Sequence, residues 1–469
     1  MVFSSMIFLW IFLPICLVGN YISNKLYKNN NLSNIFLLVL SIIFYAWGEP
    51  IYIFLMIFSI FINWLLGIGV ERFSKNKIII LIIDIIINLL LLGYFKYAGM
   101  VVDVINAVLG TDMETPDIAL PIGISFFTFQ ALSYVIDVYR GECKTQTNLF
   151  KLALYVSFFP QLIAGPIVKY KDVNEQIDHR ILSVGQTAEG IRRFCYGLGK
   201  KVLISNVLAA GADAIYAMEV SDVTGVMAWM ASLLYTFQIY YDFSGYSDMA
   251  IGIGKMLGFE FKENFNYPYT SFSIREFWRR WHISLSSWFK EYVYIPLGGN
   301  KKGGKRTYIN LSIVFLLTGI WHGADVSFVL WGLYHGLFNV IERLGFEKIL
   351  KKSKIFSWIY TFMLVNIGWI FFRTESTVRS VQYILRMSMP WRYVDSNFSI
   401  WELMNGHTVF VLICAVLGMG VFQRLVEGKY LEKCWKGSIG EIIFCILLLL
   451  FSIFSLASNT YNPFIYFRF

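Results

Sequence analysis

Charged residues are scarce in this chain. They make up only 15% of its 469 residues, whereas hydrophobic residues make up 57%. A soluble globular domain carries about 25% charged residues, and so much apolar surface could not all be hidden from water. The composition therefore argues against an ordinary soluble domain and predicts an all-α polytopic membrane protein.

Roughly eleven hydrophobic stretches approach or exceed the length of about 20 residues that a spanning helix needs. They lie near residues 5–20, 35–60, 78–95, 121–138, 150–168, 194–217, 226–253, 309–341, 355–372, 408–424 and 440–457. The first stretch has no basic segment before it and no small-residue cleavage site after it, so we expect an uncleaved first span. Since no soluble domain, linker or internal repeat interrupts the series, residues 1–469 are predicted to form one membrane domain.

Cysteine and histidine are also rare. The six cysteines show no C-x-x-C spacing, which indicates neither a disulfide framework nor zinc. No two of the five histidines share ligand spacing, and no carboxylate cluster accompanies them, so no metal site is expected. Two acids in DFSGYSD, Asp242 and Asp248, are six residues apart and are interpreted as polar groups lining a packed helix or its end.

The net charge of +9 is unevenly distributed. Basic residues gather in residues 71–77, 255–306 and 342–354, whereas the loops near 96–120 and 219–222 are acidic. Because Lys and Arg mark cytoplasmic loops, the basic loops are predicted to face the cytoplasm and both termini the outside. The distribution favours a membrane topology over nucleic-acid binding.

Three segments interrupt the series of spans. Residues 255–308 are rich in aromatic and basic residues but contain no run of spanning length. Residues 309–341 are too long for one span and break at WHGAD, which predicts two half-length helices or a hairpin that lines a cavity. Residues 373–405 carry apolar residues at helical spacing, which predicts an interfacial helix outside.

His322 follows Trp321 inside an apolar stretch. An ionisable residue at membrane depth by default marks a functional site, and a neutral imidazole there could act as a general base. The alternative is a hydrogen-bonded structural histidine between packed helices. For His335, thirteen residues later, the structural alternative is the stronger one.

His282 lies in a basic and aromatic segment, FWRRWHISLSSWF. Its neighbours Trp278, Arg279, Arg280 and Trp281 could form a gate for an anionic donor, because Arg binds phosphate through paired hydrogen bonds. An interfacial helix anchored by tryptophan and arginine explains the same residues equally well. The spacing does not decide between these two interpretations.

Taken together, five motifs in order resemble the membrane-bound O-acyltransferase family, in its bacterial AlgI- and PatA-like branch of alginate and peptidoglycan O-acetylation. The motifs are PIGISFFTFQALSYVIDVYRG, FFPQLIAGPI, QIYYDFSGYSDMAIGIGKMLGF, REFWRRWHISLSSWFKEYVYIPLGGNKKG and LTGIWHGADVSFVLWGLYHG. The resemblance covers nearly the whole chain. It implies tilted helices around a central funnel, with re-entrant or half-length helices.

The resemblance also implies roles for particular residues. His322 matches the family's catalytic histidine, and His282 would line the cytoplasmic approach. Substrate-binding residues are then expected at Trp278, Arg279, Arg280, Trp281, Trp321 and Asp325. The chain departs from the family pattern at Lys290 and Glu291, where Arg-Asp is frequent, and at Ser327, where tryptophan is frequent, which leaves the shape of the acyl pocket open.

The chain ends in PFIYFRF, with Tyr466 among apolar side chains. This segment, within residues 460–469, resembles the tail of a small partner protein in the D-alanylation system, whose tyrosine is thought to carry an acyl group. A phenol is a usable carrier because its pKa of about 10 makes its ester more reactive than an alkyl ester. The alternative is an interfacial aromatic anchor that closes the last helix.

The resemblance implies a bacterial inner-membrane protein that moves acetyl groups from acetyl-CoA, with no bound cofactor. The groups would pass to a secreted or membrane-anchored acetyltransferase, of the SGNH-like, AlgJ-like or AlgX-like kind, which modifies an extracellular or cell-wall polysaccharide. A D-alanyl transfer protein of the DltB kind and a non-enzymatic transporter of lipid-linked sugars remain alternatives. The lipid bilayer is an expected partner, and nucleic acid is not.

Overall fold

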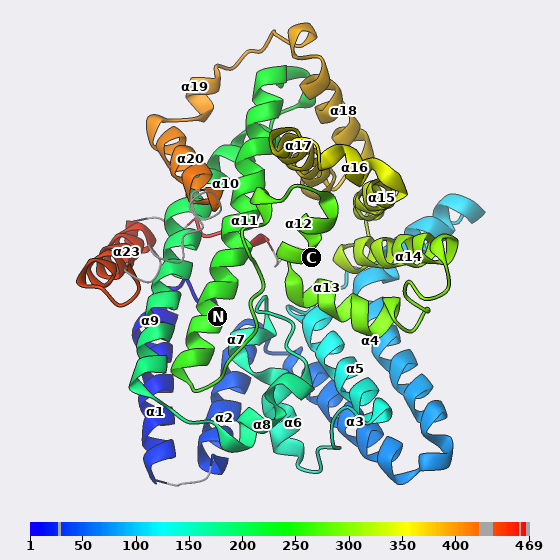
Figure 1. Cartoon of the computed structure of the whole chain (residues 1–469), viewed down its shortest axis with the longest axis vertical. Coiled ribbons are helices and arrows are strands. Elements are labelled where there is room, and N and C mark those ends of the chain that lie inside the picture. The colour runs from blue at the N-terminus through cyan, green and yellow to red at the C-terminus, as the bar shows by residue number, and fades with distance from the viewer. Residues whose placement is uncertain (27–29, 422–434, 459–460, 466–469) are drawn as a thin grey trace. The chain divides into compact units, whose positions relative to one another are not determined.

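A computed structural model describes residues 1–26, 30–421, 435–458 and 461–465 (Figure 1). The part of the chain so described is helical, without strands. It divides into two compact units. One unit comprises Met1–Phe194 and Ser247–Lys262, and the other comprises Cys195–Tyr246 and Glu263–Phe469.

The helices of the first unit occupy most of its residues. They are η1 (Phe8–Phe12), α1 (Leu13–Leu26), α2 (Asn31–Gly48), α3 (Ile53–Arg72), η2 (Ser74–Asn76), α4 (Lys77–Leu109), α5 (Ile124–Arg140), α6 (Leu149–Ser157), α7 (Phe159–Leu162), α8 (Tyr170–His179) and most of α9 (Val184–Gly199). Helix α5 packs against α3 and α4, and α2 packs against α1 and α6.

The second unit begins inside α9 and contains most of α11. Its first half holds η3 (Lys200–Ser205), α10 (Asn206–Tyr216), η4 (Val220–Asp222), α11 (Gly225–Met256), η5 (Pro268–Thr270), α12 (Ile274–Arg280), α13 (Ile283–Phe289) and η6 (Lys290–Tyr294). Its second half holds α14 (Gly304–His322), α15 (Val326–Ile341), η7 (Glu342–Phe346), α16 (Glu347–Leu350), α17 (Lys354–Thr374), α18 (Thr377–Ser388), η8 (Pro390–Arg392), α19 (Ile400–Leu403), α20 (Gly406–Gly418) and α23 (Ile439–Ser458).

Six helices within the described ranges are long and apolar enough to cross a membrane. They are Phe8–Leu26, Asn31–Gly48, Ile53–Arg72, Ser74–Leu109, Lys354–Thr374 and Ile439–Ser458. They confirm the predicted multi-pass membrane protein, since a hydrocarbon core about 30 Å thick needs helices of about this length. The number of hydrophobic stretches, about eleven, stays a prediction.

Several predicted stretches correspond to shorter helices. The stretch at 150–168 contains most of α6 and all of α7, which are separated by a break at Phe158. The stretch at 309–341 contains most of α14 and all of α15, and the stretch at 408–424 contains most of α20, which has only 13 residues. The break between α14 and α15 lies within WHGAD, as the sequence predicted. Apolar composition did not locate the break at Phe158 or the short length of α20, because a buried short helix and a spanning helix share the same composition.

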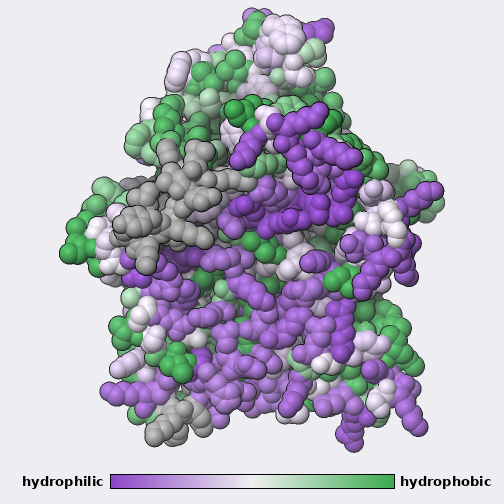
Figure 2. Space-filling view, viewed as in Figure 1, coloured by the Kyte–Doolittle hydropathy of each residue, from purple (hydrophilic) through white to green (hydrophobic). Residues whose placement is uncertain are grey.

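Large apolar side chains are exposed on the long helices. On α4 they include Ile78, Ile79, Ile82, Ile83, Ile86, Leu89 and Leu90. Figure 2 shows such hydrophobic surface beside hydrophilic side chains that gather on the face turned toward the viewer. An apolar surface of this kind suits lipid, in which the helix satisfies its own backbone hydrogen bonds.

Helices α14 and α15 pack closely on one another. A Cβ atom added at Gly332 would lie 2.3 Å from the carbonyl oxygen of Phe315 and 3.1 Å from the Cα of Gly319. Real Cβ atoms do not approach other atoms so closely, so this crossing requires glycine. Small residues at a helix crossing let two backbones approach closely, as they do in many membrane proteins.

The predicted cytoplasmic loop, residues 255–308, contains short helices with well-defined ends. Helix α12 begins after Ser273, whose side chain accepts a hydrogen bond from the backbone N–H of Glu276 (3.0 Å). The Glu276 carboxylate in turn accepts from the N–H of Phe272 (2.9 Å). The Ser273 cap satisfies a backbone N–H that the short helix would otherwise leave unpaired.

In residues 373–405 the structure contains the amphipathic helix α18. Tyr383 is buried and stacks on Tyr216 with 4.9 Å between ring centroids, whereas Val378, Val381 and Leu385 are exposed. The helix therefore buries its aromatic residue and presents an apolar row on its other side. Its place at a membrane interface stays a prediction.

The close crossing of α14 and α15 makes a testable prediction. The variant Gly332→Ala forces the two backbones apart, and overpacking of this kind costs about 1–3 kcal/mol. We expect the purified variant in detergent to have a lower melting temperature than the wild type, measured by tryptophan fluorescence.

Gly93→Ala in α4 is the matched control, because an added Cβ there meets nothing within 4 Å. Alanine also favours a helix over glycine by up to about 1 kcal/mol. A Gly332→Ala protein that melts at the wild-type temperature would show that the crossing tolerates a side chain.

Candidate active site

His322 is the last residue of α14, and its side chain is enclosed by aromatic rings. It is 3% exposed. Its ring centroid lies 4.8 Å from that of Trp321, 5.0 Å from that of Trp331 and 5.1 Å from that of Phe372, all at steep interplanar angles. Three helices, α14, α15 and α17, thus supply this aromatic enclosure. A base in such surroundings acts with little competition from water.

The chain turns sharply directly after His322. Gly323 adopts an extended conformation, and α15 begins after Asp325, whose carboxylate accepts a hydrogen bond from the N–H of Ser327 (2.7 Å). Asp325 is exposed and acts as a helix cap, which helps to hold the start of α15 in place. Its predicted role in substrate binding is not tested by this contact.

His282 lies against the same tryptophan as His322. The ring centroids of His282 and Trp321 are 6.3 Å apart. The ring of Phe243, on α11, also packs on His282, with 4.6 Å between centroids. One indole ring therefore touches both imidazoles, although the two histidines are 40 positions apart in the sequence. The structure brings together three of the predicted site residues, His282, Trp321 and His322.

The surroundings of His282 assign its tautomer. Its Nδ1 lies 3.2 Å from the side-chain oxygen of Asn264, which also accepts from the backbone N–H (3.2 Å) and the hydroxyl (2.9 Å) of Ser284. An oxygen that serves donors in this way requires the proton of the neutral ring to be on Nδ1, so Nε2 carries the lone pair. Burial lowers the pKa of His282 to about 3, which keeps the ring neutral near pH 7.

The aromatic and basic neighbours of His282 point in different directions. Trp278 packs on Phe315, with 5.5 Å between centroids, and Trp281 packs on Trp369 at 4.8 Å. Both tryptophans are buried, Arg279 is exposed, and Arg280 forms an ion pair with Glu276 at 3.0 Å. Their predicted role in binding a donor stays a prediction.

His335 sits in a second aromatic enclosure. Its ring is fully buried, lies parallel to Phe277 at 6.2 Å and has further rings around it, those of Trp278, Trp331 and Tyr334, at 5.3–5.5 Å. Among the residues that the structure describes, neither ring nitrogen has a hydrogen-bond partner. The Nε2 atom would lie only 2.7 Å from a Cβ added at Gly368, so the ring fills its space closely, which favours a packing role.

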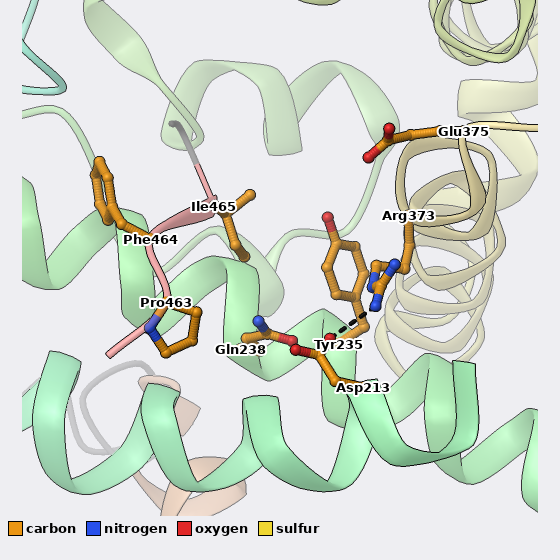
Figure 3. A pocket seen from close by; sticks show the side chains of 8 residues that line it. All are labelled: Asp213, Tyr235, Gln238, Arg373, Glu375, Pro463, Phe464 and Ile465. Atoms are coloured by element: carbon orange, nitrogen blue, oxygen red, sulfur yellow. Dashed lines mark hydrogen bonds and ion pairs between the residues drawn. The ribbon is translucent and has the colours of Figure 1, made fainter. Parts of the chain in front are cut away.

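A small pocket of the second unit is lined in part by the C-terminal segment (Figure 3). It is lined by Asp213, Tyr235, Gln238, Arg373, Glu375, Pro463, Phe464 and Ile465. Arg373 reaches Asp213 at 2.7 Å and lies over the ring of Tyr235 at 5.8 Å. Tyr466, the predicted acyl carrier, is the next residue after Ile465 and lies outside the described residues.

Sequence reasoning missed several residues of this site. Trp331 and Phe372 complete the enclosure of His322, and Asn264 orients His282, yet none of the three stands beside a histidine in the sequence. The only local sequence signal for Asn264 is a polar residue in a segment with aromatic residues, and the structure shows that its side chain is fully buried.

Comparisons with known proteins point to one family. The profile of the membrane-bound O-acyltransferase family matches residues 144–375. The chain is 43% identical over 441 residues to a probable alginate O-acetylase AlgI of Pseudomonas aeruginosa, covering 90% of this chain and 81% of that protein. It is 41% identical over 500 aligned positions to a probable alginate O-acetylase AlgI of Pseudomonas putida, covering all of both chains.

A peptidoglycan O-acetyltransferase of Helicobacter pylori is 37% identical over 421 residues, covering 82% of this chain and 80% of that protein. These likenesses extend far beyond the segment around His322 and include the spans of both units. The buried histidine at the end of α14, the multi-pass helical fold and these relatives lead to the same conclusion: the chain belongs to the membrane-bound O-acyltransferase family and is an O-acyltransferase.

Proposed function

We propose that this protein is a membrane O-acetyltransferase that passes acetyl groups from cytoplasmic acetyl-CoA across the membrane to a partner that modifies a polysaccharide outside. The observation that carries the proposal is the enclosure of His322 by aromatic rings from three helices. The acetyl group is favoured because the relatives that cover most of the chain are named as an alginate O-acetylase and a peptidoglycan O-acetyltransferase.

In this proposal Tyr466 carries the acetyl group. Its phenol oxygen bonds to the acetyl carbon, the C–S bond of the thioester breaks, and His322 passes the phenol proton to the departing thiolate, which leaves as a thiol. An acceptor hydroxyl then attacks the tyrosyl ester and receives the acetyl group, and its proton restores the phenol. A phenol suits this relay because its pKa of about 10 makes it a better leaving group than an alcohol.

Two further features support the proposal. His282 touches Trp321 and has its lone pair on Nε2, so it can accept a hydrogen bond beside the catalytic histidine. Phe464 and Ile465, the two residues before Tyr466, are buried in the second unit.

A secreted or membrane-anchored acetyltransferase is the proposed partner, and the C-terminus is proposed to face outside. The alternative of a non-enzymatic transporter is not supported, because the chain belongs to a family of acyltransferases.

The relay predicts a covalent adduct. Purified protein incubated with acetyl-CoA should gain one acetyl group on Tyr466, detected by mass spectrometry of the C-terminal peptide. The adduct should be lost in Tyr466→Phe and should fall at least about 100-fold in rate in His322→Ala, because general-base catalysis contributes 10²–10⁴-fold.

The matched controls are His407→Ala and Tyr21→Phe, since both side chains are exposed on other helices. Both controls should form the adduct at the wild-type rate. If acetyl-CoA is consumed in the presence of the partner while Tyr466 stays unmodified, transfer is direct and the tail serves as an anchor.

The hydrogen bond to His282 gives a second prediction. Asn264→Leu removes the acceptor that holds Nδ1–H, and a buried donor left without a partner costs about 1–3 kcal/mol. If this cost raises the activation barrier of acetyl transfer, the transfer rate falls by about 10- to 100-fold.

The rate is measured as adduct formation under single turnover, with Asn397→Leu on an exposed loop as the control. An Asn264→Leu protein that is folded, as judged by its melting temperature, and transfers acetyl at the wild-type rate would contradict a role for the orientation of His282.

A further inference from the structure

The C-terminal segment is held by polar contacts along its described length. The hydroxyl of Tyr461 donates to the carboxylate of Asp213, and the amide of Asn206 donates to the side-chain oxygen of Asn462 at 3.1 Å. Both partners belong to α10. Both contacts are made by side chains of the tail, so they depend on which residues the tail contains at positions 461 and 462.

The next three residues are held differently. The Lys201 ammonium donates to the carbonyl oxygen of Pro463, and the backbone N–H of Ile465 donates to Asp242 Oδ2 at 2.8 Å. Between these two residues, the ring of Phe464 packs on a tyrosine of α11, Tyr246, with 4.8 Å between centroids. Contacts to main-chain groups hold the tail backbone whatever its side chains are, and the packing of Phe464 on Tyr246 fixes which residue lies between them.

Lys201 and Asp242 are themselves an ion pair. Their charged atoms lie 2.6 Å apart, and the side chains are only 3% and 1% exposed. A buried charge needs both a partner and further hydrogen bonds to offset the loss of hydration. Here the further bonds go to the tail backbone, so the ion pair and the tail complete each other.

The local backbone is built to bring the pair together. Lys201 lies on η3, a π-helical segment between α9 and α10, and such segments frequently occur at functional sites. Asp242 lies on α11, one turn before Gly245. A Cβ atom added at Gly245 would lie 2.8 Å from the carbonyl oxygen of Gly197 and 3.1 Å from the nitrogen of Lys201, so only glycine allows α11 to approach η3 this closely.

We propose that Lys201 and Asp242 are positioning residues, whose ion pair clamps the backbone of residues 463–465 and so sets where the following residue, Tyr466, is presented for acyl transfer. The role in transfer rests on the proposed function, whereas the clamp itself does not. A carrier must reach the same place in every cycle, and a clamp on the backbone from Pro463 to Ile465 defines that place. Neither residue touches the reacting atoms in this scheme.

Two measurements on the full-length protein in detergent test the proposal. The first is digestion by a carboxypeptidase in the absence of acetyl-CoA. The rate at which Ile465 and Phe464 are released is measured from the mass of the intact protein. Lys201→Met should speed this release at least tenfold. Lys151→Met is the matched control, because it breaks a 2.6 Å ion pair with Asp178 in the other unit, and it should digest like the wild type.

A single substitution leaves one buried charge without its partner and could unfold the chain. The double variant Lys201→Met with Asp242→Asn removes both charges and keeps an acceptor for the N–H of Ile465. It loses only the bond to the Pro463 carbonyl and the ion pair. We expect the folded double variant still to release Ile465 and Phe464 faster than the wild type.

The second measurement is the single-turnover rate of acetyl transfer to Tyr466. In the double variant this rate should fall at least tenfold, while the concentration of acetyl-CoA that gives half the maximal rate stays unchanged. A folded double variant that is digested past Ile465 at the wild-type rate, or that transfers acetyl at the wild-type rate, overturns the proposal.

The two ideas fail separately. If wild-type Tyr466 never gains acetyl, the relay and the positioning role are both refuted, and faster digestion of the variants then shows only an anchor. If wild-type Tyr466 is acetylated and the variants behave like it in both measurements, the relay stands and the clamp is refuted.

Discussion

Burial of the His322 imidazole among aromatic rings is the constraint on which the rest of the site depends. The ring is held by Trp321, Trp331 and Phe372, so α14, α15 and α17 must each be placed to within a fraction of a side chain. Edge-to-face pairs of this kind contribute about 0.5–1.5 kcal/mol each and prefer particular angles, so they orient as well as stabilise. The close crossing at Gly332 is the backbone requirement that makes this placement possible.

Several of the buried polar side chains among the described residues are paired with one another. Asn264 serves both His282 and Ser284, and Lys201 and Asp242 share an ion pair that also holds the tail. In a dry interior an unpaired polar group is costly, so such pairs specify one arrangement of their helices. His335 differs, since no described residue offers its nitrogens a hydrogen bond, and packing against aromatic rings defines its place.

The proposed reaction places different demands on different parts of the second unit. A base needs a dry and rigid enclosure, which aromatic rings supply around His322. A carrier needs a reproducible position, which the proposed clamp on the tail backbone supplies. Different interactions therefore hold the two parts. Charge-assisted hydrogen bonds form the proposed clamp at Lys201 and Asp242, and packing of aromatic rings encloses His322.

Local sequence patterns determined the membrane class, the place of several long helices, the helix break after His322 and the candidate histidines, because hydropathy and glycine act over a few positions. They did not determine that the stretches at 150–168 and 408–424 contain short helices, since a short and a spanning helix can share the same composition. Nor did they show that Trp321 joins His282 to His322, that Asn264 orients His282, or that Asp242, predicted only to line a packed helix, pairs with Lys201. These contacts join residues 18 to 41 positions apart or depend on ring orientation, and only the packing of whole helices decides them.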